Sequence, residues 1–117
     1  MKPASPGAPP ISEKDWARTV VEYAELMGWT WTHFRPAMSR NGKWATHLSG
    51  HGGFPDIVAI RGGRVLFIEL KTEKGRFSDG QTDWGERLLL AATHNPGVEY
   101  LIWRPADWSE VQRVLGR

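Results

Sequence analysis

The sequence predicts a single α/β domain, a small mixed β-sheet flanked by helices in the order αβββαβα. Two apolar runs, Pro55–Ile60 and Val65–Lys71, are separated by a turn centred on Gly62-Gly63, a pattern typical of a β-hairpin. One helical segment, residues 79–93, lies between this hairpin and the last apolar run, which allows a right-handed crossover to a parallel strand. At 117 residues the chain is long enough for one domain with one core.

The first third of the chain predicts a tail, a helix and a strand. Residues 1–11 are rich in proline and small residues, so we expect a flexible tail outside the folded domain, residues 12–117. Ser12 as N-cap with Asp15 in the first turn predicts a helix start, apolar residues then recur at helical spacing, and Gly28 ends the helix. Residues 29–34 alternate and contain threonine and aromatic residues, which predicts a strand with Trp29, Trp31 and His33 on one face.

The elements after this strand are expected as follows. Residues 35–54 have no clear period and are expected to form a long loop, which in a compact domain is usually functional or mobile. Residues 78–81 form a capping box that begins the second helix, which stops before Pro96. Residues 98–103 predict the last strand, and Pro105 separates it from a short helix at about residues 106–115.

The Gly62-Gly63 turn also predicts which residues face each other in the hairpin. A symmetric loop pairs Arg61 with Arg64 and places Asp56 opposite Glu69. Opposed residues point to the same face with Cβ atoms roughly 5 Å apart, and the period of two adds Lys71 to that face. Two carboxylates this close repel each other, and partial burial adds a desolvation cost. A divalent cation between them would remove both problems; the alternative is a surface hairpin end that merely carries charges.

Pro55-Asp56 followed by Glu69-Leu70-Lys71 resembles the motif of PD-(D/E)XK nucleases. A wider set of residues resembles one family of that superfamily, the VRR-NUC family, and covers about residues 12–115. The set comprises Ser12-Glu13, Gly28-Trp29, His33, Gly53-Phe54-Pro55-Asp56, Phe67-Ile68-Glu69-Leu70-Lys71, Lys74-Gly75, Ser78 with Gln81, and Trp103-Arg104-Pro105 with Asp107. The resemblance implies a restriction-endonuclease-like core.

The resemblance also implies a metal site that uses Mg²⁺ or Mn²⁺ as its cofactor. Asp56, Glu69 and the backbone carbonyl of Leu70 would be ligands, since magnesium prefers oxygen donors and keeps several waters. Lys71 would orient or activate the attacking water, or else simply pair with Glu69 or Glu73. Glu13 would support the metal, or else is an acid that the first turn of a helix favours.

Gln81 and His33 also match positions of the family. Gln81 would act near the site, cap the second helix, or do both. His33 would contact phosphate or the metal site, or else is a core or rim residue. His47 and His51 are expected to be loop residues, because their spacing is weak support for zinc in a chain without cysteine.

The distribution of charge predicts where DNA would bind better than the net charge of +2 does. Residues 33–55 contain no Asp or Glu. We expect phosphate contacts from Arg35, Arg40, Lys43, Lys74 and Arg76, together with His33. Trp44 in this segment would either stack on an unpaired base or fold back on the loop. The alternative is that the segment is only a solvated loop.

The family likeness therefore predicts a metal-dependent DNA endonuclease that nicks branched DNA, such as Holliday junctions, as a homodimer. No small-molecule cofactor is expected. No membrane partner is expected either, because no apolar run is long enough to span a bilayer. The first residues lack an apolar signal stretch, which favours the cytoplasm. The resemblance to small stand-alone nucleases, which are common in phages, implies a bacterial or phage-infected host cell. The alternatives are a flap, nicking or general DNase without junction preference, and a DNA-binding module of the same fold that has no turnover.

Overall fold

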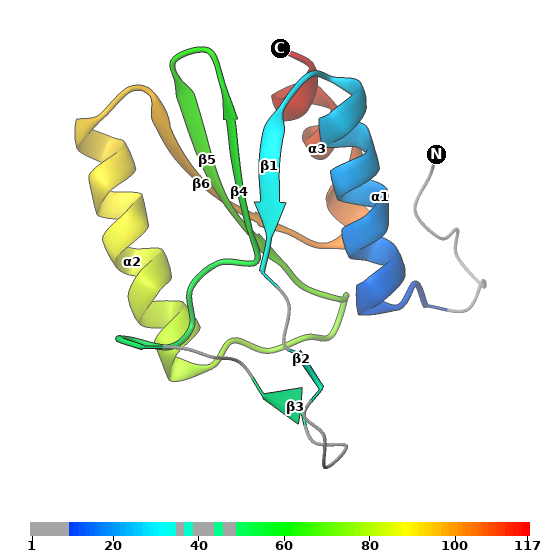
Figure 1. Ribbon diagram of the computed structural model, residues 1–117, viewed down its shortest axis with the longest axis vertical. Helices are drawn as coiled ribbons and strands as arrows, with labels where there is room; N and C mark the ends of the chain where they lie inside the picture. Colours follow the sequence, from blue (N-terminus) through cyan, green and yellow to red (C-terminus); the bar gives the residue numbers. More distant parts are fainter. Residues whose placement is uncertain (1–9, 35–36, 39–43, 46–48) are drawn as a thin grey trace.

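The computed structural model describes residues 10–34, 37–38, 44–45 and 49–117 (Figure 1). In chain order the elements are α1 (Glu13–Leu26), β1 (Thr30–His33), β2 (Ala37–Met38), β3 (Trp44–Ala45), β4 (Ile57–Arg61), β5 (Arg64–Leu70), α2 (Asp79–His94), β6 (Val98–Trp103), the 3₁₀ turn η1 (Pro105–Asp107) and α3 (Trp108–Gly116). The predicted mixed α/β domain is confirmed. No described helix is long and apolar enough to cross a membrane.

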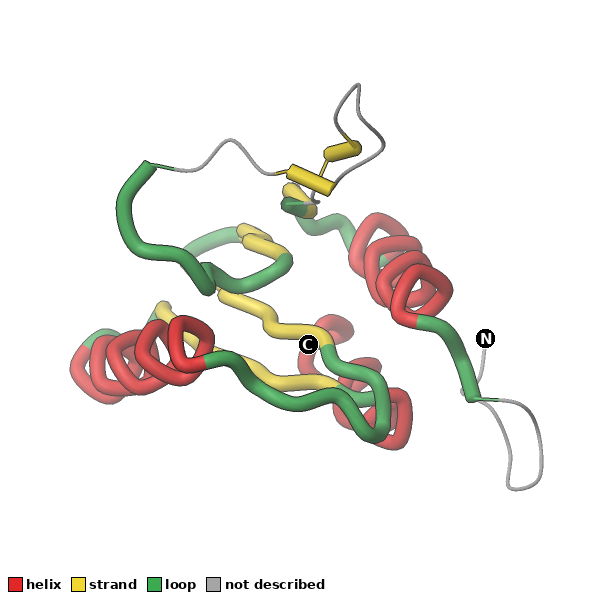
Figure 2. Tube along the Cα trace, turned by 90° about the horizontal axis from the view of Figure 1, so that it is seen from below, coloured by secondary structure: helices red, strands yellow, loops and turns green. Residues whose placement is uncertain are grey.

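The main sheet has the strand order β1-β4-β5-β6. β1, β4 and β5 are antiparallel neighbours, whereas β6 runs parallel to β5. Such a parallel neighbour needs a crossover, and α2 provides it. In Figure 1, α2 lies on one side of the sheet and α1 and α3 on the other. The view along the sheet in Figure 2 shows the same separation.

The hairpin register agrees with the prediction. Arg61 lies opposite Arg64, Ile60 opposite Val65 and Ile57 opposite Ile68, and Gly62 in the turn has a φ of 60°. Both strands lie nearer the turn than predicted: β4 runs from Ile57 to Arg61 and β5 from Arg64 to Leu70, so neither Asp56 nor Lys71 belongs to a strand. The reason is that the Asp56 side chain, not a backbone carbonyl, accepts the hydrogen bond of the Leu70 N–H at 2.8 Å. The ladder ends there, and the Asp56 carboxylate is fixed at its end.

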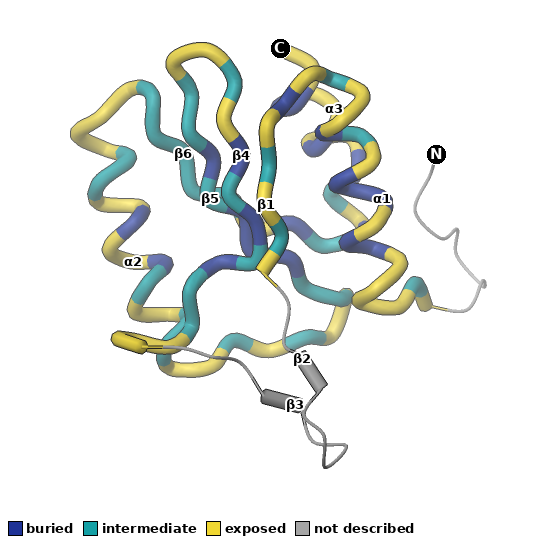
Figure 3. Tube along the Cα trace, viewed as in Figure 1, coloured by how far each residue is buried: buried dark blue, intermediate teal, exposed yellow. Residues whose placement is uncertain are grey.

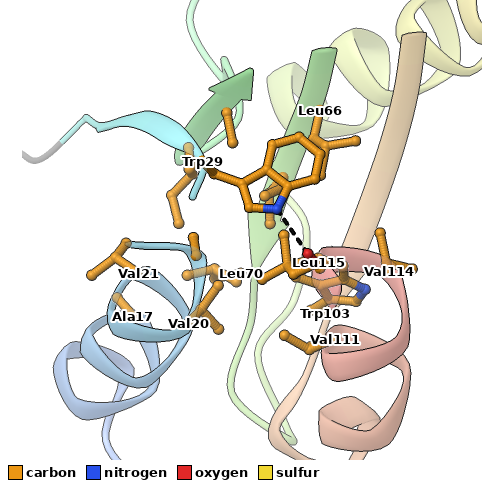
Figure 4. Close-up of a cluster of buried hydrophobic side chains, with 14 of the residues drawn as sticks. Ala17, Val20, Val21, Trp29, Leu66, Leu70, Trp103, Val111, Val114 and Leu115 are labelled. Atoms are coloured by element: carbon orange, nitrogen blue, oxygen red, sulfur yellow. Dashed lines mark hydrogen bonds between the residues drawn. The ribbon is translucent and has the colours of Figure 1, made fainter. Parts of the chain in front are cut away.

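Most of the hydrophobic core lies between the sheet and the pair α1 and α3. Trp16, Val20, Ile68, Trp103 and Leu115 are fully buried, and Figure 4 shows the facing side chains from β5, α1 and α3, with the Trp29 indole donating to the Leu115 carbonyl at 2.9 Å. Each such side chain stabilises the fold by about 1.5–3 kcal/mol. This face of the sheet anchors the strands that carry the candidate site.

The other face of the sheet is covered more thinly. Within α2 only Gly85 and Leu88 are buried, and Figure 3 shows this helix as mostly exposed. Phe54 makes edge-to-face contacts there with Phe34, Phe67 and Trp84. Helix α2 is therefore held by a few aromatic and small-residue contacts, and its first turn lies close to the end of β5.

Several boundaries differ from the prediction. The order αβββαβα omits β2 and β3, which pair with each other but are two residues long, too short to show an alternation. The last helix does not begin at residue 106. Instead η1 comes first, because Pro105 starts a tight turn and the Asp107 carboxylate accepts the Arg104 N–H at 2.8 Å. Residues 1–9 of the predicted tail lie outside the described residues, whereas Ile11 packs against the core.

Candidate active site

Asp56 and Glu69 meet at the edge of the sheet where β5 ends. Glu69 is 1% exposed, so its carboxylate is removed from water. Its Oε1 atom accepts a hydrogen bond from the Gln81 amide at 3.2 Å. Its Oε2 atom is buried and has no hydrogen-bond donor among the described residues. Asp56 is itself an acceptor, so it can share a hydrogen bond with Glu69 only when one of the two holds a proton.

This environment raises the pKa of Glu69 to about 8. Burial is the largest cause, followed by the hydrogen bond with Asp56 and the negative charge of Asp56, while the Lys71 ammonium lowers the value and the Glu13 carboxylate raises it. At neutral pH Glu69 therefore keeps its proton unless a cation replaces it.

A divalent cation fits this pair of carboxylates. A buried carboxylate oxygen without a donor, beside a second carboxylate, is satisfied by a hard cation that prefers oxygen ligands. Within the part of the chain that the structure describes, no group of three or more His, Cys, Asp or Glu side chains converges. The carboxylates at the site are thus two, and magnesium sites of this kind are completed by waters or substrate oxygens.

Gln81 connects the carboxylates to Lys71. Its Oε1 atom accepts hydrogen bonds from Lys71 Nζ at 2.8 Å and from the Ser78 backbone N–H at 2.9 Å. The Ser78 hydroxyl in turn accepts the Gln81 N–H at 3.2 Å, which completes the predicted capping box. Gln81 therefore caps α2 and lies in the site at once, so the two expected roles are compatible.

The Lys71 ammonium is held in place without a direct ion pair to Glu73. Besides Gln81, it donates to the carbonyl of Arg76 at 2.8 Å and lies 5.0 Å from the centre of the Phe77 ring. These contacts place its charge near Glu69, whose pKa it lowers. An ammonium has three N–H donors, and two are used by these described partners.

Glu13 is the first residue of α1 and is exposed. Its carboxylate raises the pKa of Glu69 through its charge, so the two lie within electrostatic reach. The Ser12 hydroxyl accepts the Asp15 N–H at 3.1 Å, which fixes the start of α1. Glu13 therefore influences the carboxylate pair through its charge.

A role for Arg104 was not predicted, although it belongs to the Trp103-Arg104-Pro105 set. Its Nη1 atom donates to the carbonyls of Thr72, Gly75 and Glu73 at 2.5, 2.9 and 3.3 Å. These carbonyls belong to the turn after β5, which also presents the Arg76 carbonyl to Lys71. The sequence feature that could have indicated this role is an arginine directly after β6, the parallel neighbour of β5. The carbonyl groups of the turn that follows β5 need hydrogen-bond donors, and this arginine supplies them.

The predicted DNA-contacting residues are only partly described. Lys74 and Arg76 lie exposed on the turn after β5. His33 lies opposite Ile57, a core residue, so the alternation of strands points it to the face opposite Glu69. Arg35, Arg40, Lys43 and His47 lie outside the described residues. His51 is exposed, and its carbonyl accepts the Trp84 indole N–H at 3.1 Å.

An open pocket of about 270 Å³ lies between α2 and β6, and Gln81 is one of the residues that line it. Phe77, Leu89, Tyr100 and Ile102 form most of its apolar wall. The pKa of the Tyr100 hydroxyl is raised to about 12 by burial, then by the charges of Glu69 and Asp56. Tyr100 thus lies within electrostatic reach of the carboxylate pair.

No protein-family model and no curated protein matches this chain.

Proposed function

We propose that the protein is a metal-dependent DNA endonuclease with a restriction-endonuclease-like core of the VRR-NUC type. The buried Glu69 Oε2 atom without a hydrogen-bond donor, beside Asp56, is the observation that carries the proposal. A buried carboxylate beside a second carboxylate needs either a shared proton or a cation between them, and a divalent cation compensates both charges at once. The Lys71 ammonium beside the pair matches the remaining part of the nuclease motif.

Asp56 and Glu69 would hold Mg²⁺ or Mn²⁺, with the Leu70 carbonyl as a further ligand and Glu13 as a supporting acid. When bound, the cation would polarise a phosphate oxygen and lower the pKa of a bound water. The protein residues would prepare the rest of the site. Asp56 is fixed by the Leu70 N–H, Glu69 is oriented by Gln81, and Lys71 is held by Gln81 and the Arg76 carbonyl.

The reaction would be an in-line hydrolysis of a phosphodiester bond. The water oxygen would form the new P–O bond while the P–O bond to the leaving sugar oxygen breaks. The attacking water would lose its proton to bulk water, and the leaving oxygen would take a proton from bulk water. The Lys71 ammonium would donate to the attacking water or to a phosphate oxygen, where negative charge increases in the transition state. Lys74 and Arg76 on the adjacent turn would contact phosphates and position the strand.

Branched DNA and a homodimer are part of the same proposal. Two sites related by a two-fold axis suit a junction with two equivalent strands. Exposed Leu89 on α2 and Ile102 on β6, an edge strand of the described sheet, support a surface that a second copy could cover. A strictly monomeric protein by light scattering at working concentration would exclude the paired-cut version.

A substrate panel tests the function. Labelled four-way junction, flap and linear duplex are incubated with Mg²⁺ or Mn²⁺, using wild type, Asp56→Ala and Lys71→Ala, with Glu22→Gln on the exposed side of α1 as control. We expect cutting that needs the cation, is lost in both site variants and persists in the control. Cutting of all three substrates at the same rate would favour a general DNase. DNA binding in EDTA without any cutting in Mg²⁺ would favour a binding module.

A further inference from the structure

Gly53 lies against the backbone of the first turn of α2. Its φ is +95°, and a Cβ atom built at this position would lie 2.2 Å from the carbonyl carbon of Gly80 and 2.4 Å from the backbone nitrogen of Gln81. Neither neighbour is a flexible side-chain end, so neither can turn aside. A Cβ at Gly80 would likewise lie 2.6 Å from the carbonyl oxygen of Gly52. Two glycine segments therefore touch backbone to backbone.

This contact joins two parts of the candidate site. Gly53 comes three residues before Asp56 on the segment that leads into β4, and Gly80 comes one residue before Gln81. The same segment is held on α2 by the His51 carbonyl, which accepts the Trp84 indole N–H, and by Phe54, whose ring lies 5.0 Å from that of Trp84. The glycine contact thus joins the Asp56 segment and the Gln81 turn through their backbones.

The position of the first turn of α2 decides whether the Gln81 side chain can hydrogen-bond to both Glu69 and Lys71. Gln81 reaches Glu69 at 3.2 Å and Lys71 at 2.8 Å, and both distances depend on how close α2 lies to the end of β5. Since α2 buries only Gly85 and Leu88 of its own residues, its core contacts alone hold it weakly. The placement of Gln81 therefore needs a contact near residue 81.

We propose that Gly53 is a positioning residue: its missing side chain lets the Asp56 segment pack against Gly80 and Gln81, which holds Gln81 on Glu69 and Lys71. Any side chain at residue 53 would push the first turn of α2 outward and break both hydrogen bonds. The kinetic part of this inference rests on the proposed nuclease function.

The chain offers a matched control. Gly50 also has a φ of +95°, but a Cβ there meets no atom of the described residues within 4 Å. Gly50→Ala and Gly53→Ala therefore share the strain of an alanine at positive φ, and only Gly53→Ala adds the clash. Gly80→Ala tests the contact from the α2 side without positive φ, at a position where alanine has the better helix propensity.

The first readout is single-turnover and steady-state cleavage. A misplacement of about 1 Å costs on the order of 10²-fold in rate, so we expect kcat to fall by about that factor in Gly53→Ala and Gly80→Ala, with KM little changed. Gly50→Ala keeps the wild-type kcat. In the Gln81→Ala background, Gly53→Ala adds no further loss, because the residue it positions is gone. Equal kcat in Gly50→Ala and Gly53→Ala, or fully additive losses, would overturn the proposal.

The second readout does not need activity. The ¹⁵N signal of the Lys71 ammonium, assigned by its loss in Lys71→Arg, reports its hydrogen bond to Gln81. We expect faster proton exchange at this ammonium in Gly53→Ala and in Gly80→Ala, but not in Gly50→Ala. Gly80→Ala and Gly50→Ala should have equal thermal stability, so a difference between these two variants does not reflect a loss of folding. An unchanged signal in Gly53→Ala and Gly80→Ala would refute the positioning role. If wild type cuts no DNA, the proposed function fails, and this signal still decides the role of Gly53.

Discussion

The side-chain amide of Gln81 donates a hydrogen bond to Oε1 of Glu69 at 3.2 Å. The orientation of this amide is fixed, because its oxygen already accepts hydrogen bonds from Lys71 and Ser78. One residue thus orients the buried carboxylate, holds the ammonium and caps a helix. The placement of Lys71 and the orientation of Glu69 consequently depend on α2, although the two carboxylates themselves come from the hairpin and the residue that precedes it.

Replacing this donor by an acceptor should change the pH dependence of cleavage. In Gln81→Glu the Lys71 and Ser78 contacts can persist, but a carboxylate oxygen now faces Glu69 and raises its pKa further. We expect the rising limb of the pH–rate profile to move to higher pH, with about a tenfold loss of rate at pH 7 for each unit of that shift. Gln112→Glu, on an exposed position of α3, is the control. An unshifted profile in Gln81→Glu would argue against Glu69 as a required anion.

Metal-free stability should fall as the pH rises. The folded-state pKa of Glu69 is about 8, above its ordinary value of 4.5, so between these values the folded protein binds a proton that the unfolded chain does not. The stability contributed by this proton is complete below about pH 4.5 and is lost as the pH rises to about 8, with a slope of up to about 1.4 kcal/mol per pH unit. Urea unfolding in EDTA measures this slope. Glu69→Gln should flatten it, and an equal slope in that variant would assign the effect elsewhere.

Cation binding should release a proton. Because Glu69 keeps its proton at pH 7, Mn²⁺ must displace it, and we expect close to one proton per bound cation. Calorimetric titrations in two buffers of different ionisation enthalpy give this number directly. At pH 9 the release should be small. A proton count near zero at pH 7 would mean that the cation binds without Glu69.

Arg104 should matter for Lys71 as well as for stability. Arg104→Ala leaves the carbonyls of Thr72 and Gly75 without their donor, which should cost about 1–3 kcal/mol in urea unfolding. The loosened turn should also release the Arg76 carbonyl from Lys71 and lower kcat.

Arg61→Ala is the matched control for Arg104. Arg61 donates to two carbonyls as well, those of Met27 and Leu115, at the opposite end of the hairpin. The Arg61→Ala variant should lose about as much unfolding free energy as the Arg104→Ala variant and keep the wild-type kcat. If both variants lose kcat in proportion to stability, Arg104 has no specific role in the site.

The hairpin and its carboxylate pair could be predicted from the sequence because a short turn fixes the register. Once Gly62-Gly63 is the turn, Ile57 must face Ile68, and Asp56 and Glu69 must lie at the same end. Both capping signals and the last strand followed from local patterns in the same way.

The rest of the site depends on distances between elements that no local pattern contains. The bond between Gln81 and Lys71 needs the position of α2 relative to β5, and the glycine contact needs two segments almost thirty residues apart to meet. The Arg104 bonds join the end of β6 to the turn after β5 in the same manner. Two-residue strands such as β2 and β3 are too short to carry a period at all.

The most direct test of the account is Mg²⁺-dependent cleavage of a labelled four-way junction by wild type and by Glu69→Gln. Glutamine keeps the size of the buried side chain and removes its charge, so the fold should persist, as far-UV circular dichroism would verify. The account predicts cutting by wild type and a loss of cutting in Glu69→Gln that added Mn²⁺ does not restore. Cutting at the wild-type rate by a folded Glu69→Gln protein would contradict it.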